Sequence, residues 1–227
     1  MANAQAFNQA FRIHVKSIGP AASQELARAA RSGETTILRD QTVRRGIIPG
    51  HTEAVDGQRG RPFESVKPDG QIVAVFDYRA EIVAACFEEL RARSPVVSGD
   101  FRDSHFCQLD GQGLPPLTVP TAQQVKAVTM ITVTNPLPYA RKLEVGLTEG
   151  GAPFVKQVDP HIFESAAVAV KREFAGVARI KFSYVDLEGA YVPVAARAAR
   201  RAVLGGARVA KRATQAIRYP AIFIDQW

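Results

Sequence analysis

The chain has 227 residues, of which 46% are hydrophobic and 22% charged, and its formal net charge is +7. These values exclude a chain that is disordered throughout and allow one sizeable core, or one core with arms. No apolar run approaches the roughly 18 residues of a membrane-spanning helix, so we expect no membrane partner. The N-terminal stretch shows no signal-peptide pattern and two cysteines make no disulfide framework, which together predict synthesis in a reducing cytoplasm.

The N-terminal third predicts a short strand and a helix followed by an extended arm. Residues 11–16 alternate as a strand does, and 19–34 have a helical pattern with Gly33 at the expected end. Residues 39–62 are polar, rich in glycine and broken by proline, which predicts a long loop that binds a partner. Residues 62–78 carry a Pro-Asp-Gly turn between two β-rich runs and therefore predict a hairpin.

The middle of the chain predicts alternating helices and strands. Residues 79–94 form an amphipathic pattern that Pro95 ends, with charged residues such as Arg79 and Glu81 expected to point to solvent. Strands are expected over 101–109, 127–135 and 178–187, and helices over 137–146 and 160–174. Because no βαβ unit repeats, we expect an α+β fold with a largely antiparallel sheet packed with two or three helices.

The positive charge is concentrated near the C-terminus. Removing the seven basic residues of 190–218 from the total of 29 leaves 22, which equals the 22 acidic residues of the chain. Residues 194–218 predict a helix with the cations along one line and alanines opposite. The basic residues are Arg197, Arg200, Arg201, Arg208, Lys211, Arg212 and Arg218.

Three interpretations of this basic face remain open: a solvated surface, contact with an acidic partner, and contact with DNA. No helix-turn-helix pattern precedes the helix, so sequence-specific DNA binding is not favoured. Residues 219–227 form an apolar, strand-like tail that needs covering by this chain or by a neighbour.

Candidate catalytic and metal-binding residues are sparse. His105 and Cys107 are two residues apart, but nothing around them supplies the setting of a thiol nucleophile. Asp159, His161 and Glu164 are less dense than usual metal-ligand sets, and Asp159 is better explained as a helix cap. Phosphate-binding glycine loops are absent. We therefore expect no enzymatic activity, no metal site and no cofactor.

Three short motifs, in order, resemble the tail-completion or head–tail joining proteins of long-tailed bacteriophages. The first is SPVVSGDFRDSH at 94–105, where a proline, a Ser-Gly pair and an aromatic-Arg-x-Ser strand start fill the family's positions. The second is VTNPLPYARKLEVG at 133–146, and the third is the helix HIFESAAVAVKREF that follows. Phe101 departs from the Leu or Tyr usual there. The resemblance covers roughly residues 72–185, so the basic helix inherits no role from it.

The resemblance implies a structural virion protein of the phage neck, made in the bacterial cytoplasm, that forms a ring, usually of six copies. Its expected partners are other copies of itself, head-side connector or portal proteins, tail tube or terminator proteins, and DNA passing through the channel. Residues 94–105 would form an architectural corner. Interfaces between subunits or neighbouring rings are expected at Arg102, Asp103, Tyr139, Arg141, Glu144 and Trp227.

The expected organisation is an N-terminal strand, helix and arm over 1–61, a tail-completion-like core over 62–188, and a basic helix with a tail over 189–227. Two alternatives remain: a basic DNA-associated accessory protein that shares the fold, and a tail-terminator protein.

Overall fold

A computed structural model describes residues 10–14, 20–96, 98–147, 159–187 and 218–225. The fold is α+β with antiparallel sheets, as predicted. The chain divides into two compact units, Met1–Glu81 with Thr121–Lys126, and Ile82–Pro120 with Ala127–Trp227. The expected boundary at 61/62 falls inside the first unit, and the C-terminal strand belongs to the second.

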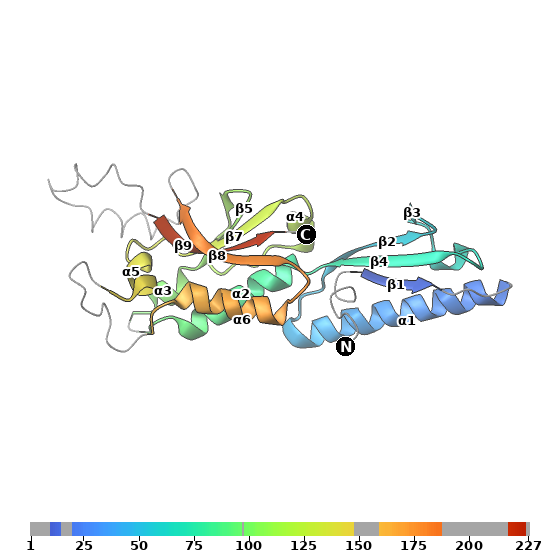
Figure 1. Ribbon diagram of the computed structural model, residues 1–227, viewed down its shortest axis with the longest axis horizontal. Helices are drawn as coiled ribbons and strands as arrows, with labels where there is room; N and C mark the ends of the chain where they lie inside the picture. Colours follow the sequence, from blue (N-terminus) through green and yellow to red (C-terminus); the bar gives the residue numbers. More distant parts are fainter. Residues whose placement is uncertain (1–9, 15–19, 97, 148–158, 188–217, 226–227) are drawn as a thin grey trace. The chain divides into compact units, whose positions relative to one another are not determined.

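The first unit is a four-stranded antiparallel sheet of order β1-β4-β2-β3 with one long helix (Figure 1). Its elements are β1 (Ala10–His14), α1 (Pro20–Arg45), β2 (Gly50–Val55), β3 (Gln58–Arg59), the 3₁₀ turn η1 (Phe63–Ser65), β4 (Gln71–Asp77) and α4 (Ala122–Lys126).

The core of the first unit lies between α1 and one face of the sheet. On β4, Ile72, Ala74 and Phe76 alternate with more exposed residues and are buried. Leu26 and Ala30 of α1 are also buried, one helical turn apart, and α1 contacts β1, β4 and η1. This is the stripe-on-sheet packing that an amphipathic helix requires.

Three predictions for the first unit were wrong: the helix end at Gly33, the loop over 39–62 and the hairpin over 62–78. The helix continues through Gly33 to Arg45, and 50–55 and 58–59 are strands, so the expected loop over 39–62 is mostly regular structure. The turn at 68–70 exists, since the Gly70 N–H donates to the Lys67 carbonyl at 2.9 Å. However, β4 pairs with β1 and β2 and not with residues 62–67.

The second unit is a five-stranded antiparallel sheet of order β6-β5-β7-β9-β8, with α2 and α6 on the same side of it in Figure 1. Its elements are α2 (Arg79–Arg93, within this unit from Ile82), α3 (Asp100–Asp103), β5 (Phe106–Leu109), β6 (Gln112–Gly113), β7 (Met130–Thr134), α5 (Ala140–Val145), α6 (Ile162–Glu173), β8 (Arg179–Asp186) and β9 (Arg218–Asp225).

The C-terminal strand β9 lies in the interior of this sheet. It pairs with β7 on one side and β8 on the other, and Tyr219, Ile222 and Ile224 are fully buried. A strand that is covered on both faces has a nearly continuous apolar sequence, and the apolar tail of this chain fits that position. The strand prediction is confirmed, and this chain itself supplies the cover.

Three details of the chain from Arg79 onward differ from the predictions. The segment expected to be a strand from 101 begins with the helical turn α3, and β5 starts only at Phe106. Arg79 and Glu81 were expected in solvent but are buried, and Arg79 pairs with Asp77 at 2.7 Å. Arg218 begins β9 and is not helical, whereas the rest of the predicted basic helix lies outside the described residues.

None of the helices in the described ranges combines the length and apolar character needed to cross a membrane.

Candidate functional site

The three motifs that carry the family resemblance meet around one buried imidazole. We call this cluster the His105 junction and define it as Ser94, Phe101, His105, Asn135 and Phe163. Ser94 Oγ lies 2.9 Å from His105 Nε2, and Asn135 Nδ2 lies 3.3 Å from His105 Nδ1. The rings of Phe101 and Phe163 pack edge-on against the imidazole at centroid distances of 5.1 and 5.6 Å. The first, second and third motifs each contribute at least one residue.

Local backbone chemistry explains how the first two motifs reach the junction. Pro95 follows the end of α2, and Gly99 has φ of +81°, a conformation in which glycine avoids the strain of a side chain. Asn135 follows β7, and its amide donates to the Phe101 carbonyl at 2.7 Å while its oxygen accepts from the Leu137 N–H at 3.0 Å. The two corners are thus tied together by one side chain.

The hydrogen bonds determine the tautomer of His105. The Ser94 hydroxyl donates to the Leu90 carbonyl at 2.6 Å, so its oxygen is left to accept a hydrogen bond from the N–H at His105 Nε2. The Asn135 side-chain nitrogen Nδ2 can only donate, so His105 Nδ1 must accept. The network therefore requires a neutral imidazole with its proton on Nε2. Burial, together with the positive charge of Arg91, lowers the pKa of His105 from 6.5 to about 3.

His105 and Cys107 do not form a nucleophile–base pair. Cys107 Sγ donates to the Thr118 carbonyl at 3.5 Å, and burial raises the pKa of this thiol to about 12. A thiol nucleophile needs a thiolate and a base that can take a proton near neutral pH. Both requirements fail here, and His105 is fully buried.

Glu144 acts within the chain as the cap of α6. Its carboxylate oxygens accept from the N–H groups of Phe163 at 2.8 Å and Glu164 at 3.0 Å, and its side chain is 1% exposed. Burial raises the pKa of Glu144, and these two hydrogen bonds partly offset that rise. Glu144 was expected at an interface between subunits, but its carboxylate accepts backbone hydrogen bonds from α6 of the same chain. Asp159 was expected to cap the helix, whereas the N-cap is His161 and the side-chain acceptor is Glu144.

The other predicted interface residues of the second unit lie at or near the surface. Asp103 is exposed and pairs with Arg91 at 3.4 Å, and the Tyr139 ring lies 6.1 Å from that of Phe101. Burial and the charge of Asp100 raise the pKa of Tyr139.

Two arginines complete the described part of this predicted interface. The Arg141 guanidinium lies 5.5 Å from the Tyr184 ring centroid, within cation–π range. Arg102 is half-buried, and within the described part of the chain its Nε is buried without a hydrogen-bond partner.

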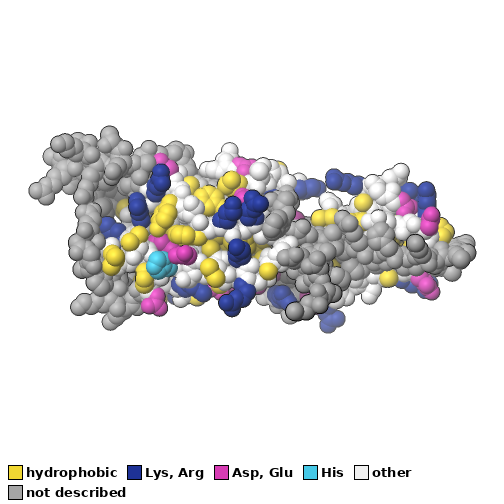
Figure 2. All heavy atoms as spheres, viewed as in Figure 1, with side chains coloured by type: hydrophobic (Ala, Val, Ile, Leu, Met, Phe, Trp, Pro, Cys, Tyr) yellow, Lys and Arg dark blue, Asp and Glu magenta, His cyan; other side chains and the backbone are white. Residues whose placement is uncertain are grey.

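Exposed apolar and basic side chains are interspersed on the second unit (Figure 2). Val145 and Leu147 at the end of α5 are 43% and 48% exposed, and Val168 on α6 is 58% exposed. Single exposed apolar side chains are ordinary on a protein surface, so these three residues do not by themselves identify a contact site.

The remaining predicted contact residues are only partly described. Trp227 and the basic residues from Arg197 to Arg212 lie outside the described residues. Arg218 is exposed at the start of β9, in register with Asp186 of β8.

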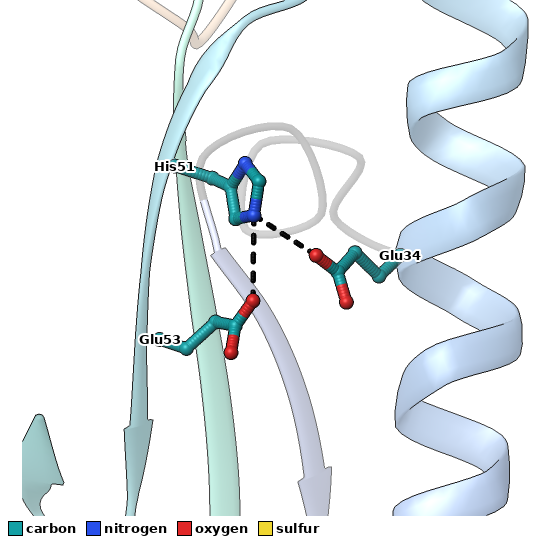
Figure 3. A group of neighbouring side chains, drawn as sticks. All are labelled: Glu34, His51 and Glu53. Carbon is teal, nitrogen blue, oxygen red and sulfur yellow. Dashed lines mark ion pairs between the residues drawn. The ribbon is translucent and has the colours of Figure 1, made fainter. Parts of the chain in front are cut away.

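A group of metal-ligating side chains in the first unit was missed by sequence reasoning. Glu34, His51 and Glu53 point toward one another from α1 and β2 (Figure 3). Burial and the neighbouring Glu53 raise the pKa of Glu34. The His-x-Glu spacing was visible, but 39–62 had been interpreted as a loop, in which alternate residues share no face.

A second such group, Glu144, His161 and Glu164, lies at the start of α6. His161 and Glu164 were considered as metal ligands from the sequence together with Asp159, whose place in this group Glu144 takes. Both oxygens of Glu144 already accept backbone hydrogen bonds.

Comparison of the chain with protein-family models, curated proteins and solved structures gives no match.

Proposed function

We propose that this chain is a structural protein of the phage neck, a subunit of a ring that joins the filled head to the tail. The observation that carries the proposal is the His105 junction. Three motifs whose sequence resembles the head–tail joining family, spread over 94–174, contribute to one buried cluster. The residues that carry the resemblance and the residues of the buried cluster are therefore partly the same, which supports the proposal.

The chemistry of the junction fits an architectural role. Its polar groups are neutral and satisfied by one another, and the buried carboxylate of Glu144 caps a helix. Such a network fixes two corners of the fold and offers no reactive group to a substrate. Binding to neighbours then falls to the surface beside it, where Asp103, Tyr139 and Arg141 lie.

A ring needs a heterologous contact, in which one face of a subunit meets a different face of the next. Arg141 is the sharpest candidate for such a contact, since it is exposed while its guanidinium is held over Tyr184. A preoriented arginine loses little side-chain entropy on binding and is a frequent anchor of interfaces.

An in vitro joining assay tests the proposal. Heads and tails are taken from a lysate whose phage lacks this chain, purified chain is added, and infectious particles are counted. Wild-type chain should restore joining, and Arg141→Glu should reduce it at least tenfold. Lys171→Glu, the same charge change on the exposed side of α6, serves as the matched control and should restore joining. Failure of the wild-type chain to restore joining would overturn the proposal.

A second candidate function is that of a DNA-associated accessory protein, which the basic residues between Arg197 and Arg212 favour. It predicts binding to random duplex DNA with a steep dependence on salt, because each phosphate contact releases counterions. Absence of binding at physiological salt would exclude it.

A further inference from the structure

We propose that Glu34, His51 and Glu53 form a binding site for a divalent transition-metal ion of the zinc class. The site lies wholly in the first unit and is independent of the proposed function. It departs from the sequence-based expectation that the chain has no metal site.

The fold brings the three side chains to one point. His51 and Glu53 are two residues apart on β2, so both side chains lie on the same face of the sheet. Their partners on β4 are Phe76 and Ala74, whose side chains are buried on the face that packs against α1. The ligands from the strand therefore face the helix.

The helix supplies the third ligand from its buried stripe. Glu34 lies one helical turn beyond Ala30 and two beyond Leu26, both of which are buried. At the next position of an otherwise apolar stripe the chain carries a carboxylate, and the side chain is only 18% exposed. A carboxylate on the inner face of a helix needs polar partners, and the side chains that it meets are the imidazole of His51 and the carboxylate of Glu53.

The distances fit coordination by one ion. His51 Nε2 lies 2.9 Å from Glu34 Oε1 and 3.3 Å from Glu53 Oε1, and all three candidate ligand atoms lie within 4.8 Å of one another. Ligand bonds of about 2.0–2.2 Å in tetrahedral geometry place neighbouring ligand atoms about 3.3–3.6 Å apart. The His51–Glu53 pair already has the required spacing, and the His51–Glu34 pair would have to open by about 0.4 Å to admit the ion.

The donor set selects the class of ion. One imidazole nitrogen and two carboxylate oxygens suit Zn²⁺, with Mn²⁺ weaker by the usual order of affinities. Mg²⁺ and Ca²⁺ prefer oxygen ligands only and would gain little from His51. Three protein ligands leave a coordination position for water, and the side chains of His51 and Glu53 are 28% and 32% exposed, which gives an ion access.

The site is partly preorganised. The His51 ring packs on Phe76 at a centroid distance of 5.4 Å, which restricts its rotation. An ion bound here would link α1 to β2 and stabilise the first unit, because binding to the folded state alone raises its stability.

Calorimetry with Zn²⁺ on the chelator-treated, full-length chain without a histidine tag tests the site. Wild type should bind one Zn²⁺ per chain, and Glu34→Gln, His51→Gln and Glu53→Gln should each weaken binding at least tenfold. Glu25→Gln, an exposed carboxylate of the same helix, and His161→Gln, in the second cluster, should both bind as wild type does. Zn²⁺ should also raise the melting temperature of wild type by several degrees and that of His51→Gln by much less.

Two results would overturn the proposal. The first is that wild type binds no Zn²⁺ up to about 0.1 mM free ion, a concentration well above a micromolar dissociation constant. The second is that His161→Gln loses Zn²⁺ binding while His51→Gln keeps it. Circular dichroism checks that the variants fold. If a variant fails to fold, the absorption spectrum of wild type with Co²⁺ bound serves as the test in place of calorimetry on that variant. Visible bands of a bound, low-coordinate ion that Zn²⁺ displaces support the site, and the spectrum of aqueous Co²⁺ rejects it.

Discussion

The buried imidazole at the centre of the motif junction makes a specific prediction about acid. In the folded chain His105 is fully buried and its pKa is lowered to about 3, while the unfolded chain has the ordinary value of 6.5. Between these two values the unfolded state binds a proton that the folded state does not. The contribution of His105 to stability is therefore complete above pH 6.5 and is lost as the pH falls toward 3.

The magnitude follows from the two pKa values. The whole difference between 6.5 and about 3 corresponds to about 5 kcal/mol. Lowering the pH from about 7.5 to about 5.0 should remove about 2 kcal/mol of unfolding free energy through this one residue. This loss of about 2 kcal/mol depends almost entirely on the pKa of His105 in the unfolded chain, so it is the same for any folded-state pKa below about 4.

Urea unfolding at these two pH values measures the effect, with His105→Gln as the reference that cannot titrate. Both proteins share all other titrating groups, so the wild type should lose about 2 kcal/mol more than the variant. Equal losses would refute the buried neutral imidazole. If the variant does not fold, the ring-proton NMR shift of His105 in wild type gives the same test. It should stay constant from pH 7.5 to 5.0, and titration near 6.5 would contradict the assignment.

Three further predictions concern the second unit. Replacing Glu144 with Ala should destabilise it by about 1–3 kcal/mol, because two N–H groups of α6 lose their acceptor, and a loss below about 0.5 kcal/mol in thermal or urea unfolding would argue against the cap. Gly146→Ala should lower the free energy of unfolding more than Gly111→Ala. Both glycines have positive φ, but of the two only Gly146 would place a new Cβ against another residue, 2.5 Å from Pro160. Equal losses of unfolding free energy would show that the clash relaxes. Cys107 should react with iodoacetamide at neutral pH much more slowly in the native than in the urea-unfolded chain, and equal rates would contradict its burial.

The elements predicted well from the sequence are those with strong local signals. The helix over 79–94 has a helical period and a proline after its end, and α5 ends at Gly146, whose φ is +74°. The helix α1 was misjudged because Gly33 is a weak stop. A glycine inside a helix costs only about 1 kcal/mol, and α1 continues past it to Arg45.

Long-range partners could not be predicted. The tail 218–225 was recognised as a strand, but its place between β7 and β8 depends on pairing with residues far away in the sequence. Glu144 looked like a surface residue because its helix is short, and the N–H groups that it accepts from lie 19 and 20 positions later. Glu34 and His51 meet only after α1 packs on the sheet, a contact that no local pattern specifies.

The central claim, that this chain joins heads to tails, is tested most directly by electron microscopy of particles from a lysate in which its gene carries an early stop codon. The proposed function predicts filled heads and finished tails lying apart, and joined particles once the intact gene is supplied in trans. Normal, infectious, fully joined particles in the absence of the chain would contradict it.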